Sequence, residues 1–208
     1  MQYIVESKQF KDYLQETDII DFSHPAIQKI MDSVEEEGVN EIEKVKVIYE
    51  FVRDQISHSW DIQSNIITLK ASEVAELKTG ICYAKSNLLA ALLRKSGIPC
   101  GFCYQRLMLF DTPDKGYCLH AFNGVYIQSL KKWIVLDARG NKPGVEAEFS
   151  LTIEKLAFSV KEEMGEKTYP YIFVAPNKQT IDILKKSTDA IDMYKYHLPT
   201  SLSFVNRQ

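Results

Sequence analysis

Three residues near the middle of the chain have the types and the order that acyl transfer through a thiol requires. Cys82 follows Thr79-Gly80-Ile81 and opens a predicted helix. The first backbone N–H groups of a helix have no internal partner and the helix dipole is positive there, so a thiolate at this position would be stabilised. His120 lies inside a predicted strand, where it could act as the base. Asp137 ends the next predicted strand, where it could orient the imidazole.

The pairing of these two strands decides whether His120 and Asp137 can meet. We suppose that Ile127 pairs with Lys132 across the turn between the strands. Phe122 then faces Asp137, and because side chains alternate between faces, His120 shares that face. The two residues become diagonal neighbours about 7–8 Å apart, within side-chain reach. A turn one residue longer or shorter would separate them unless a bulge restored the parity, so the arrangement is allowed but not forced.

Three other interpretations compete for the cysteines. A buried free cysteine is often only a small apolar residue. Cys100 and Cys103 have Cys-x-x-Cys spacing, and Cys118 and His120 follow close behind, so these four residues could bind zinc. Against zinc, cysteines three residues apart in a strand point to opposite faces. A thioredoxin-type redox pair would open a helix, whereas this pair precedes a strand.

The elements around Cys82 predict an α+β fold. Apolar residues recur at helical spacing in three stretches before it: 26–34, 40–56 and 71–77. The helix at 82–95 is apolar around most of its circumference, which predicts a central, buried position. Three stretches after it are rich in aromatic and β-branched residues: 101–110, 117–127 and 133–137. These form a predicted antiparallel meander, so we expect a nucleophile helix packed on an antiparallel sheet, preceded by N-terminal helices.

The length and charge of the chain predict one soluble domain. We expect a single domain over residues 1–208, with its core at about 40–140, a helical segment at 1–39 and a C-terminal extension of unknown role at 150–208. Within that extension the pattern indicates a strand at 171–175 and a helix at 180–196. The net charge of -3 gives no reason to expect nucleic acid or an acidic membrane as a partner. Without an apolar stretch of signal-peptide or membrane-spanning length, we expect a cytoplasmic protein with reduced thiols.

Several ordered blocks resemble one known family. The stretch Thr79–Pro99, with Gly-Ile-Cys near its start and Leu-Arg-Lys-Ser-Gly-Ile-Pro at its end, resembles the nucleophile helix of the transglutaminase-like superfamily. His120–Tyr126 is similar to its histidine strand, Trp133–Asp137 to its aspartate strand and Ala71–Ala75 to the short helix upstream. The resemblance spans about residues 40–140. It implies a papain-like core in which a cysteine, a histidine and an aspartate act together through a thioester.

The resemblance also implies how the developing oxyanion is held. The backbone N–H of Cys82 is one donor, and the indole of Trp60 is the matching candidate for a second. Phe122 stands where many members have tryptophan, and Ala138-Arg139 follows the aspartate where many have proline or threonine. Both departures lie near the expected cleft and bear on specificity. No acidic cluster has calcium-loop spacing, so we predict no metal and no cofactor.

We therefore expect an enzyme that hydrolyses a peptide or related amide, with Cys82, His120 and Asp137 as its triad. Protein-glutamine cross-linking is the alternative, because the triad is shared and only the resolving nucleophile differs. A non-catalytic binding module on the same fold is a further alternative. The other histidines (His24, His58 and His197) are assigned structural roles, since none has a cysteine or carboxylate at motif spacing.

Overall fold

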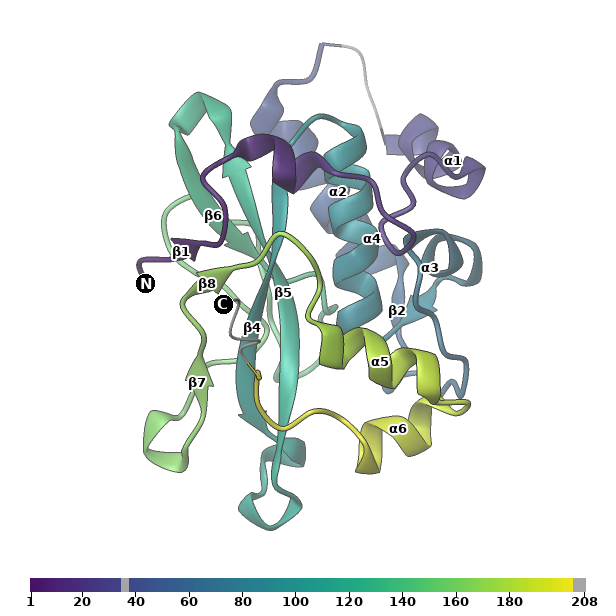
Figure 1. Ribbon diagram of the computed structural model, residues 1–208, viewed down its shortest axis with the longest axis vertical. Helices are drawn as coiled ribbons and strands as arrows, with labels where there is room; N and C mark the ends of the chain where they lie inside the picture. The colour runs from purple at the N-terminus through teal and green to yellow at the C-terminus, as the bar shows by residue number, and fades with distance from the viewer. Residues whose placement is uncertain (35–37, 204–208) are drawn as a thin grey trace.

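Helix α4 (Cys82–Lys95) lies at the centre of the molecule. The computed structural model describes residues 1–34 and 38–203 of the chain. Helix α4 is enclosed by other helices and by a sheet (Figure 1), and almost every one of its residues is buried. The prediction from its apolar circumference is confirmed. Buried leucines and alanines hold this helix in the core, so the residue at its first position has little freedom to move.

The sheet has four strands, and all neighbours in it are antiparallel. In spatial order they are β6 (Lys132–Leu136), β5 (Tyr117–Ile127), β4 (Cys100–Met108) and β7 (Lys167–Thr168). Ile127 pairs with Lys132, and the same register continues to the pair of Asn123 and Leu136. The register predicted from the sequence is therefore confirmed, and no bulge is needed to bring His120 and Asp137 to one face.

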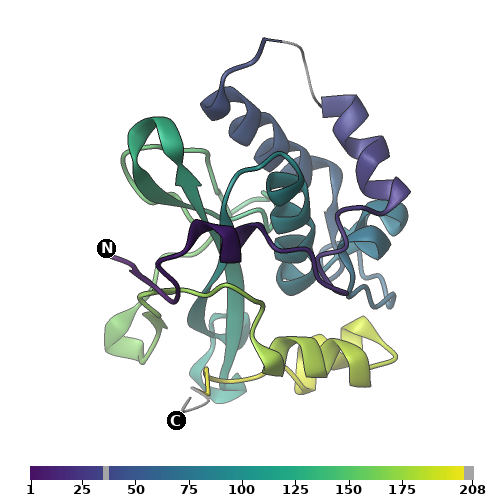
Figure 2. The same cartoon turned by 45° about the horizontal axis from the view of Figure 1, so that its top comes forward.

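Three helices accompany α4 on the same side of the sheet (Figure 2). They are α1 (Pro25–Val34), α2 (Glu41–Gln55) and α3 (Ala71–Leu77). The side chain of Asn40 caps α2 by accepting a hydrogen bond from the Glu43 N–H, which explains where that helix begins. Each of the three matches a stretch of helical apolar spacing.

The first 24 residues differ from the helical segment expected at 1–39. They contain a short strand, β1 (Ile4–Val5), and a 3-10 helix (Phe10–Leu14). Strand β1 pairs in parallel with β8 (Tyr171–Ile172), and the buried Tyr13 hydroxyl donates to the carbonyl of Ile172. These contacts come from a segment more than 150 residues away in the sequence. Tertiary pairing therefore sets the local structure here.

A two-residue parallel pair lies just before α4 and was not expected from the sequence. Strand β2 (Ser57–His58) pairs with β3 (Thr79–Gly80), and His58 is the partner of Gly80. A side chain at Gly80 would come within 2.9 Å of the Thr68 hydroxyl oxygen. Glycine therefore allows the close packing that joins β2 to the start of α4.

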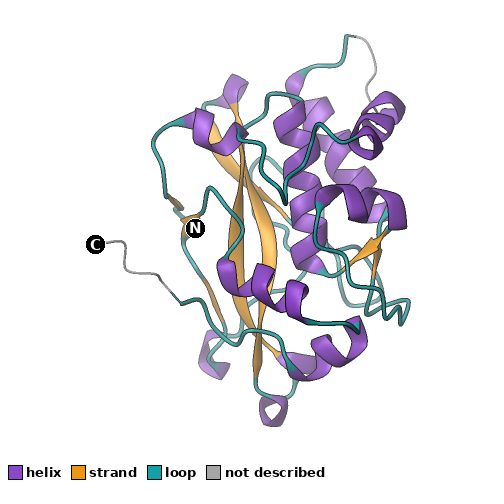
Figure 3. Ribbon diagram, turned by 45° about the vertical axis from the view of Figure 1, so that its right-hand side comes forward, coloured by secondary structure: helices purple, strands orange, loops and turns teal. Residues whose placement is uncertain are grey.

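The C-terminal extension forms two helices in place of the single one expected at 180–196 (Figure 3). They are α5 (Lys178–Lys186) and α6 (Ala190–Tyr196). Helix α5 ends at Lys186, and Asp189 starts α6 because its carboxylate accepts from the N–H groups of Ile191 and Asp192. The remaining short 3-10 helices are Leu109–Asp111, Pro113–Lys115, Gln128–Leu130 and Glu162–Met164. Within residues 1–34 and 38–203, no helix has both the length and the apolar character to cross a bilayer.

Candidate active site

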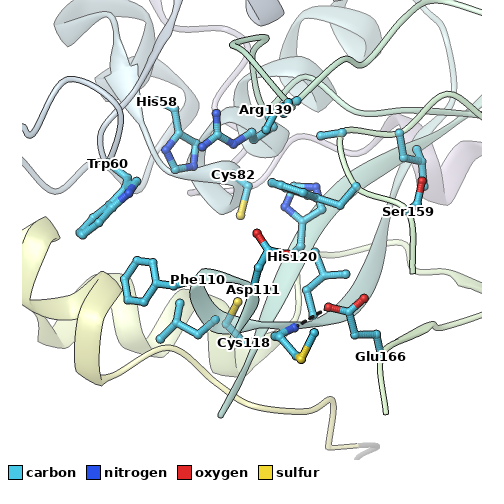
Figure 4. A pocket seen from close by; sticks show the side chains of 18 of the residues that line it. His58, Trp60, Cys82, Phe110, Asp111, Cys118, His120, Arg139, Ser159 and Glu166 are labelled. Carbon is cyan, nitrogen blue, oxygen red and sulfur yellow. Dashed lines mark hydrogen bonds between the residues drawn. The ribbon is translucent and has the colours of Figure 1, made fainter. Parts of the chain in front are cut away.

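A cavity of about 810 Å³ opens at the N-terminal end of α4. Cys82 and His120 line it, and its walls come from segments far apart in the sequence (Figure 4). One wall belongs to the sheet and includes Leu119 and Cys118. The opposite wall belongs to the helical side and comes from β2, the loop after it and α6. We call these the sheet wall and the helical wall.

Cys82 is the first residue of α4, and its side chain lines the cavity. It is 7 % exposed, so the sulfur is largely enclosed but reaches the open space. Ile81 at the N-cap provides no side-chain acceptor for the first N–H groups of the helix. These N–H groups and the positive end of the helix dipole therefore lie at the end of the cavity that holds the Cys82 thiol.

His120 and Asp137 form a buried hydrogen bond between Nε2 and Oδ2, 2.7 Å long. The Asp137 carboxylate also accepts from the backbone N–H groups of Arg139 at 3.1 Å and Ala157 at 2.9 Å. Burial alone would raise the pKa of Asp137, but His120 and the two N–H groups outweigh burial and lower it. A charged carboxylate is thus held in place beneath the imidazole.

The charge of His120 follows from this partner. Burial favours the neutral imidazole, but the negative charge of Asp137 and that of a Cys82 thiolate, with hydrogen bonds to both, raise the pKa of His120 well above its usual 6.5. Since Asp137 occupies Nε2, the nitrogen left for the sulfur is Nδ1. Cys82 and His120 line this cavity and Asp137 is buried behind the imidazole, and Figure 4 shows the Cys82 sulfur beside the His120 ring.

Trp60 also lines the cavity, on the helical wall. Its ring stacks on Tyr194 with centroids 4.8 Å apart and lies 5.1 Å from the ring of Phe110. The three rings come from the loop after β2, the β4–β5 hairpin and α6. The structure thus places Trp60 in the cavity that holds Cys82, and its role as an oxyanion donor stays a prediction.

His58 lines the same cavity, although the sequence analysis assigned it only a structural role. It is 4 % exposed and lies in β2, with its ring edge-on to Tyr194 at 5.9 Å. Burial, together with the positive charge of Arg139, lowers the pKa of His58 well below the usual value. Only the tertiary pairing of β2 with β3 reveals its position.

Arg139 is a second cavity residue that its sequence position did not explain. Its guanidinium, 3 % exposed, forms a two-point ion pair with Asp61, in which one nitrogen lies 2.9 Å from Oδ1. Lys142 contacts the same carboxylate at 2.6 Å. Burial would raise the pKa of Asp61, but the two cations lower it to about 2. The pair joins the chain after β6 to the loop after β2, and so links the two walls.

The other cysteines occupy different surroundings. Cys100 and Cys103 belong to separate apolar clusters on opposite faces of β4, as the strand geometry predicts. Burial raises the pKa of the Cys100 thiol to about 12. Cys118 lines the cavity, and burial and the nearby Cys82 raise its pKa to about 12. In the part of the chain that the structure describes, no three His, Cys, Asp or Glu side chains are grouped to hold a metal ion.

One solved structure and one family profile agree with this architecture. A search of curated proteins gave no match. Among solved structures, a protein from Cytophaga hutchinsonii described as a candidate cysteine protease has a TM-score of 0.51 at 20 % identity, covering 64 % of this chain and 43 % of that one. A structure described as a TGase has a TM-score of 0.45 at 16 % identity, covering 89 % of this chain and 52 % of the other.

The chain therefore spans about half, or less, of each solved protein that it resembles. At 20 % identity the first likeness supports the fold alone. The sequence profile of the Transglutaminase-like superfamily matches residues 28–138, which is more than half of the chain and contains the cysteine, histidine and aspartate described above. The chain belongs to the transglutaminase-like superfamily.

Proposed function

We propose that the chain is a cysteine-dependent acyl-transfer enzyme that hydrolyses peptide or related amide bonds through a thioester. One observation carries the proposal. The cavity at the start of α4 contains a thiol and an imidazole, and a buried carboxylate binds the imidazole at 2.7 Å. A nucleophile, a base and an orienting acid in that order are what acyl transfer requires.

The first half of the reaction forms the thioester. The Cys82 sulfur attacks the amide carbonyl carbon, the S–C bond forms, and the carbonyl oxygen takes the negative charge. The tetrahedral intermediate collapses when the C–N bond breaks, and the His120 imidazolium gives its proton to the departing amine. Asp137 keeps the ring oriented and stabilises its charged form throughout, as its contacts in the structure allow.

The second half releases the acid. Water attacks the thioester carbonyl, His120 accepts a proton from that water, and the S–C bond breaks to regenerate Cys82. Cross-linking would replace water by a primary amine and would otherwise use the same groups. Hydrolysis is favoured because no feature of the cavity indicates a dedicated amine site, since its lining mixes both charges and apolar side chains.

The test begins with the reactivity of the thiol. Iodoacetamide at pH 7 should label Cys82 far faster than Cys100, Cys103 or Cys118, because Cys82 alone has the imidazolium and the helix N-terminus beside it. Peptide mapping by mass spectrometry identifies the labelled thiol. Labelling of all four cysteines at similar slow rates would contradict the proposal.

The second step of the test measures turnover. A panel of peptide and glutamine substrates is assayed with and without a primary amine, with Cys82→Ala as the blank. Release of acid in both conditions supports hydrolysis, and incorporation of the amine supports cross-linking. A rapidly labelled Cys82 without turnover of any substrate would instead favour a binding module on the same fold.

A further inference from the structure

We propose that His58 donates a hydrogen bond from its imidazole to the carbonyl oxygen of the bond that Cys82 attacks. The inference rests on the proposed function and deepens it. It assigns a direct role in the reaction to a residue for which the resemblance implies none.

The first observation is an unpartnered polar group next to the nucleophile. His58 is 4 % exposed, and its Nδ1 atom has no hydrogen-bond partner among the described residues. Buried polar groups in proteins are nearly always paired, and those left unpaired in a native fold often have a functional reason. The ring lines the cavity that contains Cys82, and Figure 4 shows the sulfur between the rings of His58 and His120.

The second observation is that the backbone fixes this ring relative to the sulfur. His58 pairs with Gly80, two residues before Cys82. The N–H of Ser59 donates to the carbonyl of Gly80 at 3.2 Å, which closes the pairing on the other side of His58. Tyr194 packs edge-on against the ring. A donor held in this way needs no reorganisation when charge develops on the substrate, which is the condition for effective oxyanion stabilisation.

The third observation concerns charge. Burial is the largest cause that lowers the pKa of His58, and Arg139, Lys85 and His120 lower it further, against the opposing carboxylate of Asp61. The ring is therefore neutral at neutral pH and carries one N–H. A neutral imidazole with so low a basicity does not compete with His120 for the proton of Cys82. It can still donate to an oxygen that becomes negative.

The reaction needs such a donor. The backbone N–H of Cys82, at the first position of α4, supplies one hydrogen bond to the oxyanion. Oxyanion sites combine two or more donors, so a second must come from a neighbouring segment. Trp60 and His58 both lie on the helical wall. Trp60 belongs to the ring cluster with Phe110 and Tyr194, whereas the His58 ring is buried and has an unpaired nitrogen.

The test uses a peptide aldehyde as a probe of the oxyanion position. The Cys82 thiol adds across the aldehyde, so that an S–C bond forms, the C=O double bond becomes single, and the sulfur proton moves to the oxygen. The stability of this hemithioacetal depends on donors to that oxygen, whereas alkylation by iodoacetamide does not. We compare the full-length wild type with His58→Phe, which keeps an aromatic ring without nitrogen, and His58→Gln, which restores an N–H. His197→Phe is the control, because His197 is an exposed surface histidine.

We expect His58→Phe to bind the aldehyde about 100-fold more weakly and to acylate about 100-fold more slowly, with unchanged alkylation of Cys82. His58→Gln should retain more of both than His58→Phe, and His197→Phe should match the wild type. Equal aldehyde affinity in His58→Phe and wild type would overturn the inference. A loss of aldehyde affinity in Trp60→Phe, with no such loss in His58→Phe, would also overturn it. A wild type that neither adds the aldehyde nor alkylates quickly would reject the proposed function itself, and with it this role.

Discussion

Two buried imidazoles face one sulfur from opposite walls, and they differ in charge. His120 on the sheet wall and His58 on the helical wall are each 4 % exposed. Burial alone should lower the pKa of both rings. The pKa of His58 is indeed lowered, whereas that of His120 is raised. Burial is the largest cause at His58 and keeps its pKa low, whereas at His120 the charge of Asp137 and that of a Cys82 thiolate outweigh burial.

One short segment supplies both of these charges. Asp137 and Arg139 stand two residues apart, directly after β6. The carboxylate binds His120 at 2.7 Å, and the guanidinium acts on His58 while it pairs with Asp61. The end of a single strand thus makes His120 a cation, and through Arg139 it reinforces the burial that keeps His58 neutral. The proposed acyl transfer would use both states, since the cationic ring would move protons and the neutral ring would only donate a hydrogen bond.

The change expected to have the largest effect removes the charge on the sheet wall. Asp137→Asn keeps the shape of the side chain but leaves His120 without its anion, so the pKa of His120 should fall and the two imidazoles should become alike. We expect acyl transfer to fall by about 10⁴-fold. The labelling of Cys82 by iodoacetamide at pH 7 should fall to the rate of an ordinary thiol. Turnover assays and timed mass spectrometry measure the two effects.

A second Asp–His pair provides the matched control for this experiment. Asp192 lies 3.1 Å from Nε2 of His197 at the protein surface. Asp192→Asn removes the same charge from the same kind of pair, outside the cavity, and should leave turnover and labelling unchanged. If Asp137→Asn retained the wild-type rates, the charge difference between the two walls would have no bearing on catalysis.

The next largest effect is expected at the ion pair that joins the walls. Asp61→Asn leaves the buried guanidinium of Arg139 without its carboxylate, and an uncompensated buried charge destabilises the folded state. Because Asp61 is partly exposed and Lys142 also loses a partner, we expect a loss of about 2 kcal/mol in the free energy of unfolding. Denaturant titration measures it.

The control for that variant is a surface carboxylate. Asp114 is exposed and lies 3.9 Å from Lys115. Asp114→Asn should change the unfolding free energy by less than about 0.5 kcal/mol. Equal losses in the two variants would mean that the Asp61–Arg139 pair contributes no more than a surface contact, and that the two walls are held together by packing alone.

The sheet wall could be predicted from the sequence because its determinants are local. The turn between β5 and β6 fixes the pairing of Ile127 with Lys132, and alternation along the strands then places His120 and Asp137 on one face. The determinants of helix α4 are local as well, because an apolar stretch places it in the core and the following Ser96-Gly97-Ile98-Pro99 ends it. The sequence blocks that resemble the family lie in this helix and these two strands.

The helical wall could not be predicted because its contacts join distant segments. His58 enters the cavity through the pairing of β2 with β3, two-residue strands too short to leave a periodic pattern. Asp61 and Arg139 are 78 residues apart. Tyr194 reaches the cavity from α6. The N-terminus of α6 is held by a hydrogen bond from the Ala190 N–H to the carbonyl of Asn65. The position of His58 beside Cys82 can therefore be seen only in the three-dimensional structure.

The smallest expected effect is the pH dependence of stability, and it separates the two rings by sign. The folded pKa of His58 lies below its unfolded value of 6.5, so below that pH the unfolded chain binds a proton that the folded chain excludes, and stability falls as pH falls. The folded pKa of His120 lies above 6.5. Its stabilising contribution is therefore fully present below that pH and is lost as pH rises through the folded pKa.

The window from pH 6.5 to pH 5 isolates the titration of His58. His120 is charged in the folded chain throughout this window. Burial lowers the pKa of Lys85 to about 7, so that Lys85 titrates above the window. The carboxylates whose pKa values are lowered in the folded state, such as Asp61 and Asp137, titrate below it. We expect the unfolding free energy of the wild type to fall across the window through His58. His58→Phe should abolish most of that slope, and His120→Phe should retain it. Parallel slopes in wild type and His58→Phe, from denaturant titrations at several pH values, would show that His58 accepts a proton in the folded state and that the two walls do not differ in charge.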